Sequence, residues 1–157
     1  MTAFDLAQRY IGIHELAGAG RDHPLIQWWL SLCSLPMDSP DETPWCSAFV
    51  NGIAWELRLP RSKSAAARSW LAVGVPIPIG EARPGFDVVI FKRGDGPQPG
   101  PDVLQAPGHV AWFAGVDPQT DGVLALGGNQ SDGVSVARFS SWSVLGFRRV
   151  APESGLH

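Results

Sequence analysis

Cys46 has the sequence context of a catalytic nucleophile. It follows Thr43, Pro44 and Trp45 and leads into the apolar segment 48–50. Threonine is a favoured N-cap residue and proline suits the first position of a helix, so we expect a helix to begin here. In the first helical turn, backbone N–H groups and the helix dipole favour a thiolate over a thiol. Because the thiolate attacks carbonyl carbon, we expect Cys46 to be a nucleophile.

A thiol nucleophile needs a base, usually a histidine, and a third group that orients the base. We choose His109 among the four histidines, because it opens a strand-like segment directly after Pro107 and Gly108. At the mouth of a strand it can face the beginning of a helix. The alternative is a partly buried histidine that a backbone carbonyl satisfies. The other three lie in a loop, before a proline and at the end of the chain: His14, His23 and His157.

Asn129 is our candidate for the group that orients His109. It lies in the segment Gly127-Gly128-Asn129-Gln130, at the end of the next expected strand. An adjacent antiparallel strand would bring the Asn129 amide near the imidazole of His109. The amide oxygen would then accept a hydrogen bond from the imidazole N–H. The alternative is an asparagine that only forms a turn, since Gly-Gly-Asn is favourable turn chemistry.

Two tryptophans are candidates for lining a substrate groove, because each neighbours a proposed catalytic position: Trp45 and Trp112. Most of the seven tryptophans should lie in the core. Gln130 and Glu15 complete our candidate substrate-binding residues. Cys33, among apolar residues at a helix end, is expected to be a small buried hydrophobic residue.

Helices are expected in the first half of the chain and strands in the second, which indicates an α+β fold with an antiparallel sheet. Thr2 and Asp5 resemble a capping box, and Gly12 should end that helix. The expected helices cover about 3–11, 25–32, 46–57 and 64–71. The expected strands cover 86–92, 109–114, 123–126, 134–137 and 145–150, with a loop over 94–107 that is dense in glycine and proline.

Composition favours one domain, because the chain has 157 residues, 45% of them hydrophobic, and no internal repeat. We expect a single catalytic domain over 1–151 and a frayed tail over 152–157. The net charge of −3 argues against nucleic acid as a partner. Two cysteines make no disulfide framework and no C-x-x-C metal motif. Asp38, Asp41 and Glu42 offer oxygens for Ca²⁺, but a solvated acidic loop is our interpretation, so no metal or cofactor is expected.

The beginning of the chain has no basic segment followed by an apolar one, and no apolar run approaches the length of a transmembrane helix. We therefore expect synthesis in the cytoplasm without a signal peptide and no insertion into a membrane. We also expect a monomer.

Six motifs occur in order between about Ile11 and Val150. They are Pro44-Trp45-Cys46-Ser47-Ala48-Phe49-Val50-Asn51, Ala67-Arg68-Ser69-Trp70-Leu71, Pro84-Gly85-Phe86-Asp87-Val88-Val89-Ile90-Phe91, Gly108-His109-Val110-Ala111-Trp112-Phe113, Leu126-Gly127-Gly128-Asn129-Gln130 and Gly146-Phe147-Arg148-Arg149. This series resembles the small phage-associated branch of the CHAP and NlpC/P60 cysteine peptidase superfamily, and it spans almost the whole chain.

The resemblance implies a papain-like α+β fold, with N-terminal helices packed on a small antiparallel sheet, and cleavage of amide bonds in peptidoglycan. It carries Cys46 over as nucleophile, His109 as base and Asn129 as the polar third residue. Many CHAP domains have a glutamate two residues before this asparagine, where this chain has Gly127. Members of the branch also tend to have an acidic residue near Glu15.

The expected function is therefore that of an endolysin-like peptidoglycan hydrolase, an amidase or an endopeptidase, which reaches the wall after a phage holin opens the inner membrane. A tail-associated lysin, a gene-transfer-agent lysin or a secreted interbacterial effector would use the same chemistry. A lysozyme-like glycosidase is an alternative in which Glu15 acts as the acid, with Asp22 as its nearest carboxylate partner. A catalytically inactive wall-binding module is the remaining alternative.

Overall fold

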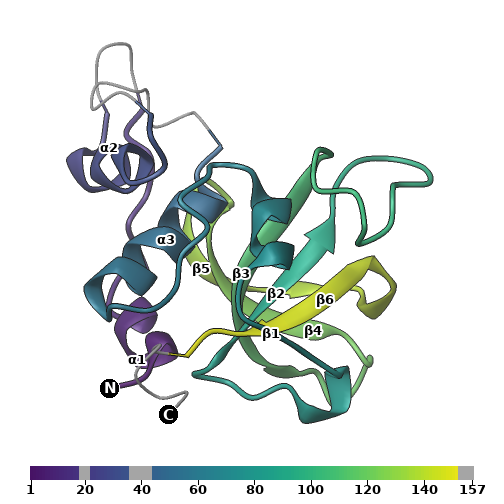
Figure 1. Ribbon diagram of the computed structural model, residues 1–157. Helices are drawn as coiled ribbons and strands as arrows, with labels where there is room; N and C mark the ends of the chain where they lie inside the picture. The colour runs from purple at the N-terminus through teal and green to yellow at the C-terminus, as the bar shows by residue number, and fades with distance from the viewer. Residues whose placement is uncertain (18–21, 36–43, 152–157) are drawn as a thin grey trace.

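The computed structural model describes residues 1–17, 22–35 and 44–151, and within these ranges the chain forms three α-helices and one six-stranded antiparallel sheet. The α+β class and the antiparallel sheet are thereby confirmed. Figure 1 shows the helices gathered on one side of the sheet. The helices are α1 (Ala3–Gln8), α2 (Pro24–Ser31) and α3 (Cys46–Glu56), and the 3-10 helices are η1 (Ala67–Ala72), η2 (Ile79–Glu81) and η3 (Ser141–Ser143).

The strands follow the spatial order β1-β6-β2-β3-β4-β5, with every neighbouring pair antiparallel. Their bounds are β1 (Val75–Ile77), β2 (Asp87–Lys92), β3 (Gly108–Val116), β4 (Val123–Gln130), β5 (Gly133–Phe139) and β6 (Val144–Arg149). The strand that carries His109 therefore lies between β2 and β4, where both of its edges can be paired. The pairing of β4 with β5 is irregular between Gly127 and Gln130.

Both faces of the sheet are apolar, and they contribute to two separate clusters. Val110 and Trp112 of β3 belong to the larger cluster, which includes Val50 of α3. Ala111 and Phe113 belong to the smaller cluster, formed by the strands themselves. This alternation follows from the two-residue period of a strand, and it explains why β2 and β3 read as nearly continuous apolar runs.

Three elements differ from the expectation. The first helix has the expected capping box between Thr2 and Asp5 but ends at Gln8 rather than at Gly12. The segment expected as a helix over 64–71 is the 3-10 helix η1. The strand β1 was not expected, because a three-residue strand has little local signal and is defined by its pairing with β6, more than 60 residues later in the chain.

A fully buried arginine holds the loop that precedes β3. The guanidinium of Arg68, in η1, donates to four backbone carbonyl oxygens at 2.8–3.0 Å, those of Pro99, Gly100, Val103 and Pro107. Backbone carbonyls of an irregular loop need partners when they are removed from water. Arg68 therefore supplies the hydrogen bonds that a helix or a strand would otherwise give these carbonyls, and it helps to define where β3 begins.

We expect Arg68→Met to lower the free energy of unfolding by about 3 kcal/mol, because several carbonyl acceptors would lose their donor at once. Urea denaturation followed by circular dichroism measures this change. Arg138→Met is a matched control, since Arg138 makes an exposed ion pair with Asp117 and its loss should cost less than about 1 kcal/mol. Equal losses for the two variants would contradict the role of Arg68.

Candidate active site

Cys46 is the first residue of α3, so the thiol lies in the first turn of a helix, as expected. The N-cap position is Trp45, and no side chain caps this end of the helix by a hydrogen bond. Pro44 therefore precedes the N-cap and is not the first helical residue, which corrects our prediction. Thr43, the expected N-cap, lies outside the described residues. The backbone N–H groups of the first turn remain available, since they have no partner within a helix.

The Cys46 thiol is buried, with 3% of the residue exposed. Burial raises the pKa of the thiol, and this outweighs the backbone N–H groups of Val110, Ser47 and Cys46 itself and the charge of Arg93, which lower it. The prediction that the helix start alone would favour a thiolate is therefore wrong for this conformation. The protein therefore holds a neutral Cys46 thiol near pH 7, and a base would have to deprotonate it before it could attack.

His109 lies near the beginning of β3, opposite Phe91 of β2, and only 7% of it is exposed. Its ring lies nearly parallel to the rings of Phe91 and Phe139, with centroids 6.1 and 5.2 Å away. Burial lowers the pKa of His109, the hydrogen bond to Gln130 raises it, and the charge of Arg93 lowers it further, with a net decrease. The imidazole is therefore neutral near pH 7 and can accept a proton.

Gln130 determines which nitrogen of His109 carries the proton. The Gln130 Nε2 donates to the carbonyl oxygens of Ser135 at 2.7 Å and Ala125 at 3.3 Å. Because these oxygens only accept, the amide cannot be reversed, and its Oε1 faces His109 Nε2 at 2.9 Å. His109 Nε2 is therefore the donor, which leaves Nδ1 with a free lone pair.

The side chain that forms a hydrogen bond with His109 is Gln130 and not Asn129, which corrects our prediction for this contact. The irregularity between Gly127 and Gln130 breaks the alternation of β4 and turns the Gln130 side chain to the face of His109. A Cβ atom at Gly127 would lie 2.7 Å from Gln130 Oε1 and 2.8 Å from the Cβ of Ala111. Gly127, which stands where many CHAP domains have a glutamate, thus leaves the space that the Gln130 amide occupies.

Cys46 lies beside the backbone of β3 next to His109, because the Val110 N–H is close enough to act on the thiol. Arg93 lies within electrostatic range of both the thiol and the imidazole. Among the described residues, Cys46 and His109 share no hydrogen bond, and Gln130 is the hydrogen-bond partner of the ring. The thiol therefore lies near the β3 backbone at the residue after His109, and Cys46 and His109 do not form an ion pair in this conformation.

The expected groove tryptophans are both fully buried, at 0% exposure for Trp45 and Trp112, so neither is available to a substrate here. The Trp45 indole stacks on Trp29 and donates to Glu15 Oε1 at 2.8 Å. Glu15 thus holds the residue that precedes Cys46, a structural role that the sequence did not reveal. Sequence reasoning also missed Arg68, although it lies in one of the quoted motifs.

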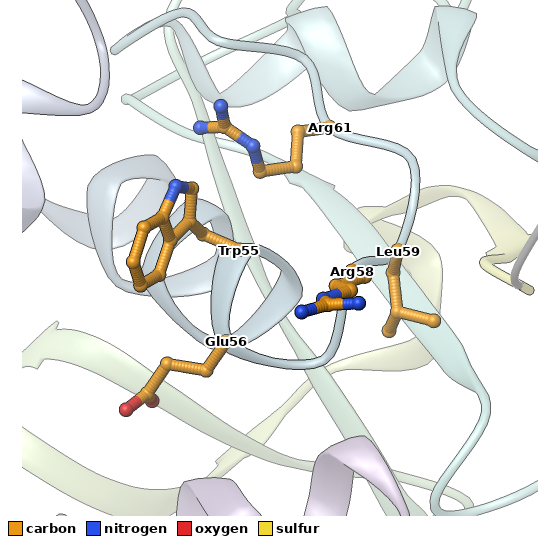
Figure 2. Close-up of a pocket in the computed structure, with 5 residues that line it drawn as sticks. All are labelled: Trp55, Glu56, Arg58, Leu59 and Arg61. Atoms are coloured by element: carbon orange, nitrogen blue, oxygen red, sulfur yellow. The ribbon is translucent and has the colours of Figure 1, made fainter.

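Two surface hollows differ in their relation to this site. One, of about 270 Å³, is lined by Lys92, Arg93, His109, Asn129, Gln130, Ser131, Ala137 and Phe139. The other, of about 520 Å³, surrounds the C-terminal end of α3 (Figure 2). Figure 2 shows Trp55 beside Arg61, with Glu56 turned away from Arg58. Since α3 has 11 residues, its last residue, which lines this second hollow, lies about 15 Å along the helix axis from Cys46.

The second cysteine has the expected structural character. Cys33 is buried, and burial raises the pKa of its thiol to about 11. Within the described ranges no cluster of three His, Cys, Asp or Glu side chains forms a metal site. The acidic residues considered for Ca²⁺ (Asp38, Asp41 and Glu42) and the tail 152–157 lie outside the described residues. In the same ranges no helix has the length and apolar character needed to cross a bilayer.

No protein-family model matches the chain, and no curated protein matches it either.

Protonation of His109 should make the stability of the protein depend on pH. The pKa of His109 is lowered in the folded protein, so the unfolded chain binds a proton more readily. The stabilising effect of a neutral His109 is complete above the unfolded pKa, about 6.5, and is lost as the pH falls through the lower folded pKa. Urea denaturation between pH 7.5 and 5 should show a steeper loss for the wild type than for His109→Gln. Parallel curves would contradict this expectation.

Proposed function

We propose that the protein is an amide hydrolase in which Cys46 is the nucleophile and His109 the base. The observation that carries the proposal is the fixed tautomer of His109, with Nε2 hydrogen-bonded to Gln130 and Nδ1 left as the acceptor. The next residue of the same strand, Val110, presents its backbone N–H to the Cys46 thiol in the first turn of α3. A base with a free lone pair, an oriented ring and a neighbouring nucleophile are the parts that thiol catalysis requires.

The reaction begins with transfer of the Cys46 proton to Nδ1 of His109, while the sulfur attacks the carbonyl carbon of an amide. The electron pair of the carbonyl moves to its oxygen, where the backbone N–H of Cys46 donates to the developing charge. When the intermediate collapses, the amine leaves with the proton from His109 and a thioester remains. Water, deprotonated by His109, then releases the carboxylic acid and restores the thiol.

The proposed substrate is the peptide part of peptidoglycan, and the proposed fold family is the papain-like CHAP and NlpC/P60 superfamily. Both rest on the six ordered motifs, and the observed helices beside an antiparallel sheet are compatible with them. Release by a phage holin, delivery with a phage tail or gene-transfer agent, and secretion as an interbacterial effector are the proposed routes to the wall.

The test is digestion of purified sacculi by the wild type, Cys46→Ala and Cys33→Ala, with mass spectrometry of the new ends. We expect new amino termini from the wild type and from Cys33→Ala, and none from Cys46→Ala. The masses also distinguish an amidase, which separates sugar from peptide, from an endopeptidase. New reducing sugar ends that persist in Cys46→Ala would replace the thiol mechanism by glycoside hydrolysis, and intact sacculi in every sample would contradict both.

A further inference from the structure

The pocket at His109 carries positive charge in a protein whose net charge is −3. Lys92 and Arg93 both line it, and no acidic side chain is among its lining residues. Lys92 is the last residue of β2, and Arg93 comes directly after it. Because this end of β2 pairs with the beginning of β3, both residues lie near His109. An anionic group that enters this pocket would meet two cations and no carboxylate.

The polar groups of the pocket are not used within the protein. Neither the Lys92 ammonium nor the Arg93 guanidinium forms an ion pair or a hydrogen bond with any residue of the described ranges. The side chains of Asn129, near the end of β4, and of Ser131, in the turn that follows, likewise have no hydrogen-bond partner in the described ranges. The surface ion pair Arg138–Asp117 shows the contrasting case, in which an arginine is satisfied by a neighbour.

Arg93 connects this pocket with the reacting groups. Burial is the main influence on the pKa of both Cys46 and His109, and the charge of Arg93 acts on both as well. A group bound to Arg93 would therefore share the pocket with His109, the proposed base. The same pocket is lined by Gln130, the hydrogen-bond partner of His109, so an occupant would lie beside the proposed base and the residue that orients it.

We propose that Arg93, assisted by Lys92, binds a free carboxylate next to the scissile amide, so that the preferred substrate is an acidic peptide. This inference rests on the proposed function, and it names the chemical class of the substrate. A guanidinium presents paired N–H donors that match the two oxygens of a carboxylate. Converting the carboxylate of the substrate into a neutral carboxamide should therefore weaken binding of the substrate, while the amide group still fits the pocket.

The experiment compares soluble muropeptides with the same muropeptides amidated by carbodiimide and ammonia. We expect the wild type to cleave the acidic form about tenfold more efficiently in kcat/KM, mainly through KM, as the loss of one charge-assisted hydrogen bond predicts. Arg93→Gln should lose this preference, so that it cleaves the acidic and the amidated forms with similar kcat/KM, about tenfold below the wild type on the acidic form. Arg58→Gln removes the same charge at the far end of α3 and should retain the preference.

A binding measurement keeps the inference separate from catalysis. Isothermal titration of Cys46→Ala with the two muropeptide preparations should show tighter binding of the acidic form, and Arg93→Gln in the same background should abolish the difference. Equal binding or equal cleavage of the two forms by the parent protein would overturn the carboxylate site. Preferential binding of the acidic form without cleavage by the wild type would support the pocket and contradict the proposed hydrolysis.

Discussion

Cys46→Ser should lower kcat/KM on purified sacculi by at least about 10³-fold. The substitution keeps the shape of the side chain, but a serine hydroxyl ionises far less readily than a thiol. His109 cannot compensate, because burial lowers its pKa and makes it a weak base. The rate of release of new amino termini measures the loss.

Two controls accompany this variant. Cys33→Ser changes the other buried thiol and should keep most of the activity, since Cys33 is not part of the proposed mechanism. The thermal unfolding temperature of Cys46→Ser should stay close to that of the wild type, because the substitution is nearly isosteric. Cys46→Ser activity within tenfold of the wild type would exclude the thiol as nucleophile.

Gln130→Leu should lower kcat by about 10²-fold, because the imidazole would lose the acceptor that fixes its tautomer and orientation. Leucine has a similar volume but removes the hydrogen bonds that Gln130 Nε2 donates to the carbonyl oxygens of Ser135 and Ala125. Some loss of stability is therefore expected as well, and the activity must be compared at a temperature where both proteins are folded. Initial rates on soluble muropeptides give kcat and KM separately.

The pH profile distinguishes a positioning role of Gln130 from a structural one. Gln130→Glu places a carboxylate beside His109, which should raise the pKa of the imidazole and move the acidic limb of kcat to higher pH. Asn129→Gly suits the left-handed backbone at this residue (φ +57°) and should affect KM rather than kcat or its pH profile. A shifted profile in Asn129→Gly together with a wild-type profile in Gln130→Glu would restore Asn129 as the orienting residue.

Local patterns determined much of the architecture. The capping box at Thr2, the proline that opens α2 and the two-residue alternation of β3 are encoded in residues that are neighbours in the chain. The strand β1 and the role of Arg68 depend on partners more than 30 residues away in the chain. Local periodicity therefore could not predict either feature. Long-range pairing is what a reading of local pattern misses.

The sequence by itself placed Cys46 in the first turn of a helix and His109 at the beginning of a strand, because helix and strand periods are local patterns. The capping residues were assigned wrongly, since the N-cap is Trp45 and no side chain caps the helix by a hydrogen bond. Only the tertiary structure decided that Gln130 holds His109, since the irregularity of β4 exchanges the face on which Asn129 and Gln130 lie. It also decided that the thiol is neutral. Burial acts on a charge from all sides, and here it outweighs the helix start that the sequence made visible.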